Sequence, residues 1–252
     1  RINSAADDAA GMAVAAKMRA DIGSLNQSVR NTNDAISLVN TYDGAAAEIE
    51  SILIRMRELA VQTRNGTYEE ADRTNANFEY TALKNEITRI AGVSAFNRMT
   101  VGQGATTANG TTTSADTSFT FYVGSDVAKT GNSISFSAKA LDLNLAVSSS
   151  TLNSVVDATS AGQAIATLDD AITELAANRA QAGALINRLE HTVSNLMNVS
   201  QRLQEAVSGI EDADYAAESA NLARGMVLAQ AGTAMLAQAN QAPQYILSLL
   251  RG

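Results

Sequence analysis

Apolar residues recur at alternating intervals of three and four over long stretches near both ends of the chain. The longer stripe extends from Ile165 to Ile210, and its polar interruptions are Arg179 and Ser200. A shorter stripe extends from Ala15 to Val39. Such repeats are typical of long helices that pack on one another, so we expect the two stripes to form one seam. The expected seam residues are Met18, Ile22, Leu25, Val29, Ile36, Ile172, Leu175, Ile186, Leu189, Val193, Leu196 and Leu203.

The spacing also predicts the length and limits of the helices. At about 1.5 Å per residue, the later helix would be roughly 65–70 Å long, which predicts a rod. The capping spacing of Ser4 and Asp7 predicts a first helix that ends near Thr41. Asp43-Gly44 predicts a turn before a second helix, which Asn65-Gly66 ends.

A third helix is expected from about Glu69 to Ala91, after the capping spacing of Thr67 and Glu70. Residues 100–118 are rich in Ser, Thr and Gly and predict a loop. Alternating apolar and polar residues then predict strands. The apolar positions of these strands are Phe119, Phe121, Val123, Ile134, Phe136, Leu141, Leu143, Leu145 and Val147.

The last part of the chain is a further predicted helix. The capping spacing of Ser160 and Gln163 predicts the start of the helix that carries the long stripe. The apolar pattern breaks at Asp212 and Asp214. An Ala-rich helix with a broad apolar face follows, and an apolar tail from Pro243 ends the sequence. Nothing in the sequence provides an obvious cover for this face, so we expect a partner. The predicted fold class is mainly α with a small β insert, a long antiparallel coiled-coil-like rod that carries a β-rich domain.

Composition narrows the function classes. Hydrophobic residues make up 46% of the 252 residues but aromatic residues only 4%, and there is a single proline, which favours helices. A net charge of −8 disfavours nucleic acids and anionic lipid surfaces. The absence of Cys excludes disulfides and thiol chemistry. The sequence contains no eighteen-residue apolar run and no visible export peptide, so membrane insertion is not expected.

Residues capable of catalysis are sparse. His191 is the only histidine and falls opposite the apolar seam, where a surface role is expected. The acidic groups near Asp7 and Glu211 fit helix-start electrostatics better than a cation site. We therefore expect no catalytic residues, no cofactor, no metal and no enzymatic activity. Two functions stay open from the residues alone. One is a hydrolase that uses paired carboxylates. The other is a surface protein whose middle domain binds a polysaccharide or ion through Phe119, Phe121 and Tyr122.

Three segments resemble those of bacterial flagellins. They are residues 1–11, beginning Arg-Ile-Asn-Ser, residues 57–62, Arg-Glu-Leu-Ala-Val-Gln, and residues 236–250, which include Ala-Gln-Ala-Asn-Gln-Ala-Pro-Gln. The resemblance extends over about residues 1–98 and 160–252. Flagellins begin several dozen residues before the first motif, so the comparison predicts that the N-terminal segment of the innermost domain is missing here.

The resemblance implies a domain plan. Residues 1–98 would be the N-terminal helical part of the rod, and residues 158–210 its C-terminal helix. Residues 99–157 would be the variable, solvent-facing outer domain. Residues 211–252 would be the C-terminal helix of the innermost filament domain. Such subunits assemble head to tail into an open helical filament, which drives motility.

The resemblance also implies location and partners. Flagellins are exported unfolded without a cleaved signal, so the expected location is extracellular, in the bacterial flagellum or on the cell surface. The expected partners are further copies of the chain, a secretion chaperone, and filament cap or junction proteins.

An animal toll-like receptor that senses flagellin is a further partner that the resemblance implies. The matching positions are Arg55, Leu59, Gln62 and Glu86. The segment departs from stimulating flagellins at Ile54, where Gln is common, and at Met56, which replaces Val. The resemblance therefore leaves activation of this receptor open.

Overall fold

The computed structural model describes residue 2 and residues 6–102, 117–124, 131–141 and 154–250. The chain forms two compact units: unit 1 comprises Arg1–Arg19 and Leu203–Gly252, and unit 2 comprises Ala20–Arg202. The predicted fold class, mainly α with a small β insert, is confirmed. The elements are α1 (Ala9–Arg64), α2 (Glu70–Val93), β1 (Ala95–Phe96), β2 (Met99–Thr100), β3 (Thr117–Tyr122), β4 (Ser133–Ala138), α3 (Ala158–Glu211) and α4 (Tyr215–Leu250).

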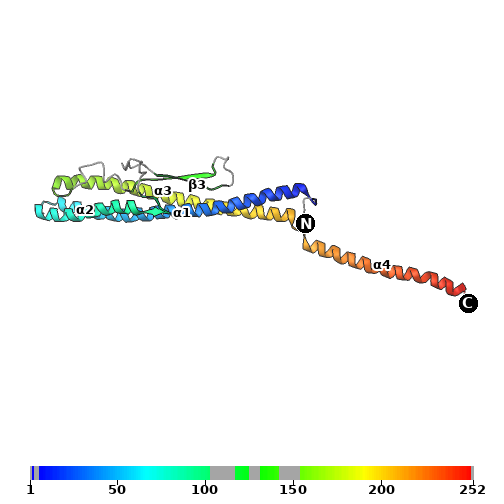
Figure 1. The fold of residues 1–252 in the computed structure, drawn as a ribbon. Coiled ribbons are helices and arrows are strands. Elements are labelled where there is room, and N and C mark those ends of the chain that lie inside the picture. The colour runs from blue at the N-terminus through cyan, green and yellow to red at the C-terminus, as the bar shows by residue number, and fades with distance from the viewer. Residues whose placement is uncertain (1, 3–5, 103–116, 125–130, 142–153, 251–252) are drawn as a thin grey trace. The chain divides into compact units, whose positions relative to one another are not determined.

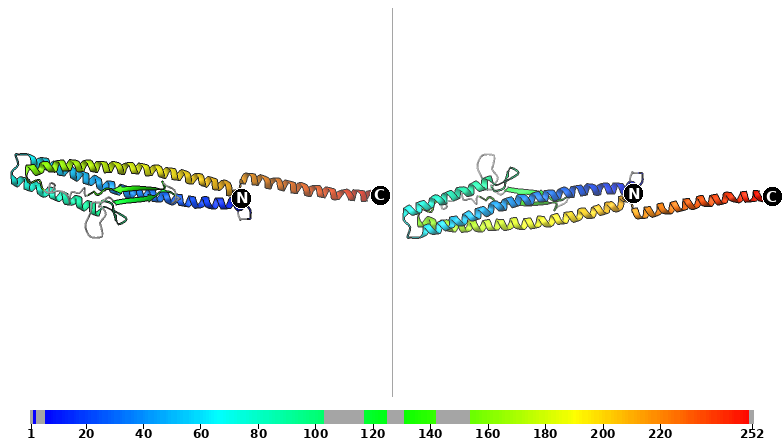
Figure 2. Two further views of the ribbon diagram at one scale, coloured as in Figure 1. Left: turned by 90° about the horizontal axis from the view of Figure 1, so that it is seen from above. Right: turned by 90° about the horizontal axis from the view of Figure 1, so that it is seen from below.

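In unit 2, α1, α2 and α3 lie side by side (Figures 1 and 2). Side-chain contacts show that α1 and α3 are antiparallel. Arg57 donates from Nε to Asp169 Oδ1 at 2.5 Å, and Ser200 donates from Oγ to Asn26 Oδ1 at 3.2 Å. Low residue numbers of α1 therefore face high residue numbers of α3.

Aliphatic residues from the three helices share one core. Ile49 and Leu53 of α1, Ile87 of α2, and Leu168 and Leu175 of α3 are all at most 1% exposed and belong to the same cluster. Burial of this apolar surface is the main stabilising contribution to unit 2.

The turn predicted at Asp43-Gly44 is wrong, because α1 continues through it without a break. Gly44 in a helix interior costs about 1 kcal/mol relative to Ala. The flanking side chains offset this cost: Tyr42 and Ala46 are buried in the core, and the Asp43 carboxylate accepts a hydrogen bond from α3. Tertiary packing therefore overrides the local turn signal.

The helix starts lie close to the expected positions, but other residues cap them. Asp8 Oδ1 accepts hydrogen bonds from the amides of Ala10 and Gly11 at the start of α1. The expected cap at Ser4 lies outside the described residues. At α2 the capping box joins Glu69 and Asp72 instead of Thr67 and Glu70, because the N-cap residue lies two positions after the predicted one.

Asp157, not Ser160, caps α3. Its Oδ1 accepts from the amides of Thr159 and Ser160 at 2.8 and 2.9 Å, and its Oδ2 accepts from Ser160 Oγ at 2.6 Å. The hydrogen bonds from Ser160 and Thr159 hold the pKa of Asp157 below its ordinary value of 3.8, because they favour the charged form.

The D157N variant provides a pH test of this cap. A depressed pKa means that the charged cap stabilises unit 2 above about pH 3.8, and that this contribution is lost as pH falls through the lower pKa of the folded state. We expect wild type to melt at a higher temperature than D157N at pH 7, with the difference shrinking towards pH 2. Circular dichroism melts across this pH range measure it. D170N, at an exposed position of the same helix, is the control, and an equal effect there would contradict the assignment.

The predicted strands around Phe119 and Phe136 are confirmed as β3 and β4, which pair antiparallel with Phe119 opposite Phe136. Phe136 packs edge-on against Tyr42 of α1, with ring centroids 5.3 Å apart. The Tyr42 hydroxyl donates to the Lys139 carbonyl at 3.1 Å. These contacts hold the hairpin on the helices, and Figure 2 shows its green strands alongside them. Leu141, the first residue of the strand expected from Leu141 to Val147, lies in a turn, and residues 142–147 lie outside the described residues.

A second hairpin, formed by β1 and β2, was not predicted. Phe96 pairs with Met99, so Asn97 and Arg98 form a two-residue turn. Both have left-handed backbones, with φ of 49° and 65°. The usual glycine signal for such a turn is missing from the sequence, which explains the failure.

Two segments distant from each other in the chain meet beside this hairpin. The Leu141 amide donates to the Gly102 carbonyl at 2.8 Å, and the Val101 amide donates to the Ser94 carbonyl at 2.9 Å. A Cβ on Gly102 would lie 2.9 Å from the Ala91 carbonyl oxygen, so only glycine fits this approach to α2. The first of these hydrogen bonds joins Gly102 and Leu141, so the two positions lie side by side at the end of α2.

Unit 1 contains the start of α1, the end of α3 and all of α4. Arg19 forms an ion pair with Glu211, and the Ile2 amide donates to the Glu211 carbonyl at 3.3 Å. Asp214 caps α4 by accepting from the amides of Ala216 and Ala217. The break predicted at Asp212 and Asp214 is therefore a new helix start.

Candidate assembly and recognition surfaces

The expected seam residues are all at least partly buried. Leu25, Leu175, Leu189 and Leu196 are at most 7% exposed. The other expected seam residues are intermediate in burial: Met18, Ile22, Val29, Ile36, Ile172, Ile186, Val193 and Leu203. Each long helix therefore turns its stripe inward, while its polar residues stay available to solvent or partners.

Arg179 is a charged residue in an otherwise apolar stripe. Its Nε donates to Asp43 Oδ1 at 2.9 Å, and its Nη1 donates to Glu50 Oε2. The two carboxylates stand two helical turns apart on α1, so one guanidinium spans them. Hydrogen bonding to Asp43 and then to Glu50 raises the pKa of Arg179. Arg179 therefore pairs with facing carboxylates across the seam.

Replacing Arg179 with Leu is expected to lower the stability of unit 2 by about 1–2 kcal/mol, because two partly buried carboxylates lose their cation. Urea unfolding curves measure the loss. The triple variant R179L/D43N/E50Q removes the stranded charges as well and should recover most of the stability. A triple variant no more stable than R179L would show that the ion pairs are not the cause.

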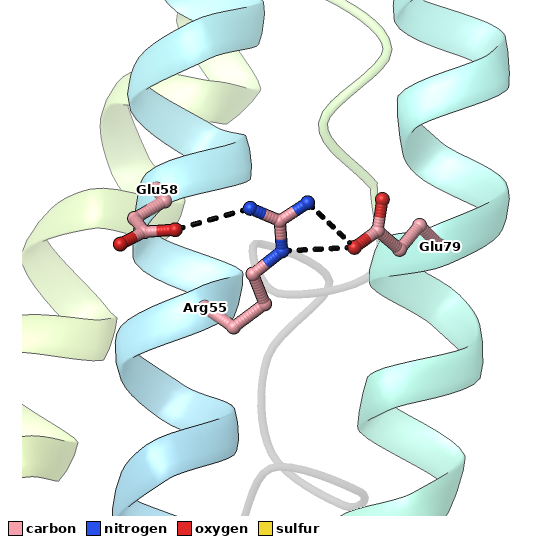
Figure 3. A network of polar contacts seen from close by, with 3 residues as sticks. All are labelled: Arg55, Glu58 and Glu79. Carbon is pink, nitrogen blue, oxygen red and sulfur yellow. Dashed lines mark hydrogen bonds and ion pairs between the residues drawn. The ribbon is translucent and has the colours of Figure 1, made fainter.

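Arg55 joins α1 to α2 on the outer surface (Figure 3). It bonds Glu79 of α2 at 2.9 Å and Glu58 of α1 at 3.1 Å. The pKa of Arg55 is raised chiefly by its hydrogen bond to Glu79 and then by that to Glu58. All three side chains are about half exposed, so the network adds little stability but fixes the position of an accessible guanidinium.

The other expected recognition residues lie in different environments. Gln62 is exposed and donates to the Tyr68 hydroxyl at 3.1 Å. Glu86 pairs with Arg89 on α2, and this hydrogen bond lowers its pKa. Leu59 is only 3% exposed and belongs to the core. We therefore expect Leu59 to support the surface from beneath, whereas the other three can be contacted directly.

Sequence reasoning missed the acidic partners that orient these cations. Glu58 and Glu79 hold Arg55, and Asp43 and Glu50 hold Arg179. The spacing of Glu58 three residues after Arg55 was a usable signal. No sequence signal pointed to Glu79, because its contact with Arg55 depends on how α2 folds back along α1.

The apolar surface of α4 is unusually large for a helix. Leu222, Met226 and Leu236 fall along one stripe, and each is at least 61% exposed. Val227, Leu228 and Met235 lie on other sides and are at least 66% exposed. A helix that is hydrophobic all round is normally buried, so this surface requires a cover.

Other sites are scarce in the described part of the chain. No group of three or more His, Asp or Glu side chains there is placed to hold a metal ion. His191 is exposed. Burial raises the pKa of Tyr80 to about 12, so its hydroxyl stays neutral at physiological pH. Among the described helices, none is long and apolar enough to cross a membrane.

Long antiparallel helices that carry a β insert, together with an uncovered apolar helix, define a structural subunit of a helical assembly. Comparisons with known proteins agree. Residues 1–107 match the bacterial flagellin N-terminal helical region, and residues 165–250 match the bacterial flagellin C-terminal helical region. The chain belongs to the bacterial flagellin family, whose members are structural subunits of the flagellar filament.

Individual relatives cover the chain in full. Flagellin from Halalkalibacterium halodurans is 43% identical over 251 residues, covering 100% of this chain and 88% of that protein. Flagellin FlaB2 from Treponema pallidum is 38% identical, with the same coverage. The crystal structure of Bacillus cereus flagellin superposes with a TM-score of 0.54 at 35% identity, covering 66% of this chain and 88% of that one.

Proposed function

We propose that this protein polymerises with copies of itself through the helices of unit 1, and that its middle region faces solvent. The observation that carries the proposal is α4, whose exposed apolar residues lie on all of its sides. Burying one such side chain stabilises a contact by about 1.5–3 kcal/mol. Several buried together supply enough free energy to hold a subunit in a polymer.

The proposed roles of the segments follow from the expected domain plan. Residues 1–98 and 158–210 form the rod, residues 99–157 the outer domain, and residues 211–252 the innermost helix. In this plan α1, α2 and α3 present polar outer surfaces to neighbouring subunits, and contacts that repeat without closing produce an open filament. The role is structural and needs no catalytic residue or cofactor.

Electron microscopy of seeded growth tests the proposal. The full-length natural polypeptide would be incubated with fragmented filaments of the same flagellin. Elongation of the fragments in proportion to added protein is expected, with no growth from a variant that lacks residues 215–252. Failure of the full-length polypeptide to elongate any seed would refute polymerisation, and would favour a surface protein whose outer domain binds a polysaccharide or ion.

We propose extracellular residence in the flagellum, reached by export with a dedicated chaperone, and contact with cap or junction proteins at the filament ends. An exposed apolar helix such as α4 needs protection before assembly, which a chaperone would supply. Co-purification of the chaperone with the wild type, but not with the variant lacking residues 215–252, tests this role of α4.

We also propose that the outer face of α1 and α2 is a recognition surface for an animal toll-like receptor. Arg55 supports this proposal, because Glu58 and Glu79 fix an exposed guanidinium on the same face of α1 as Gln62, two helical turns away. Arg is common among residues that dominate interfaces. A reporter cell line that carries the receptor should respond to the protein, and R55A should shift the response to at least tenfold higher concentration. R188A, at an exposed position of α3, is the control, and an unchanged response to R55A would contradict the proposal.

A further inference from the structure

The turn between β1 and β2 keeps two residues in a conformation that glycine adopts more easily. Asn97 and Arg98 have φ of 49° and 65°. In a two-residue hairpin turn of this kind, glycine is strongly preferred at the second position, where Arg98 stands. Asn tolerates the left-handed region, but a long side chain such as Arg does so at a cost. Arg98 therefore makes the turn less stable than glycine would, but it places a guanidinium at the tip of the hairpin.

The Arg98 side chain is free to meet a partner. Arg98 is exposed and makes no hydrogen bond or ion pair with any residue that the structure describes. This contrasts with Arg55, Arg57 and Arg179, which are all held by carboxylates. Nothing within the described fold therefore explains why Arg occupies this position.

Apolar side chains flank the tip. Val93 at the end of α2 is 61% exposed, and Met99 in β2 is 46% exposed. A cation beside exposed apolar surface is a common composition for the centre of an interface.

The charge of the chain indicates what the tip meets. The sequence has 26 Asp and Glu against 18 Lys and Arg, so copies of the chain carry a net charge of −8 and repel one another. A projecting cation is complementary to the acidic surface of another copy, and a charge-assisted bond there would offset the repulsion.

We infer that residues 97–99 form a contact tip that docks on an acidic surface of a second copy, with Arg98 donating hydrogen bonds to a carboxylate there. The inference rests on the proposed polymerisation and adds a specific contact of unit 2 to it. The strained turn keeps Arg98 because the contact needs its guanidinium, which glycine lacks.

Three variants of the full-length polypeptide separate strain from contact. R98G removes both the strain and the guanidinium, N97G changes the neighbouring turn residue but keeps Arg98 and its strain, and R98K keeps the charge. Melting temperatures of the monomers and elongation rates from filament seeds would be measured, the rates also over a range of salt concentrations.

We expect R98G to melt about 2 °C higher than wild type, because glycine adopts the left-handed backbone without strain, and N97G to melt close to wild type. R98G should elongate about tenfold more slowly and lose part of the salt dependence. N97G should elongate at the wild-type rate, and R98K should lie between wild type and R98G. Equal elongation of R98G and wild type would overturn the contact tip while leaving polymerisation intact. Absence of growth by the wild type would instead refute polymerisation, and with it the inference.

Discussion

Filament growth is expected to stop when Leu222, Met226 and Leu236 of α4 are replaced together by glutamine. The three side chains lie along one stripe and are at least 61% exposed in this structure. If assembly buries them, their loss removes about 5 kcal/mol per subunit contact. That is more than a thousandfold in affinity, which is enough to prevent elongation. Seeded growth followed by electron microscopy measures the effect.

The control keeps the apolar surface at the same positions. The variant L222M/M226L/L236M exchanges side chains of similar volume, so it should elongate at close to the wild-type rate. The melting temperature of unit 2 should be the same for both triple variants, because the substituted positions belong to unit 1. Normal growth of the glutamine variant would show that this stripe is not part of the assembly contact.

The second large effect is expected from Leu168→Ala, which should lower the stability of unit 2 by about 3 kcal/mol. Leu168 is fully buried in the cluster that joins α1, α2 and α3. Its truncation removes apolar contacts and leaves a cavity. For a domain of this size the melting temperature should fall by about 6–12 °C.

Calorimetry of the monomer measures this shift. Val61→Ala is the matched control, because Val61 is apolar but 50% exposed on α1. Its effect should stay within about 0.5 kcal/mol. Similar losses for the two variants would contradict the assignment of the core.

Periodicity was sufficient to predict the long helices and their inward faces. The stripe from Ile165 to Ile210 falls within α3, and the alternation around Phe119 and Phe136 falls within β3 and β4. These patterns record burial directly, since each apolar position repeats with the period of its element. The local signals were less reliable. Asp43-Gly44 suggested a turn, but packing on both sides of Gly44 continues the helix.

The recognition surface was only partly predictable for the same reason. Arg55 and Gln62 stand one above the other because seven residues make two helical turns. Two features depend on how α2 packs along α1 and could not be predicted: the hydrogen bond from Arg55 to Glu79 and the burial of Leu59. The sequence did not predict the hairpin at Asn97 and Arg98, because its turn lacks the glycine that usually marks such turns.

The hydrogen bond from the Leu141 amide to the Gly102 carbonyl has a consequence for how proteins of this kind diversify. A segment whose two ends are joined at its base can lengthen without moving the ends. Each doubling of a flexible loop costs only about 0.6 kcal/mol in closure entropy. Sequence inserted between residues 102 and 141, away from the β3 and β4 contacts, would therefore change what the surface displays while leaving the helices in place. The same fold can in this way carry new antigens, or an engineered peptide.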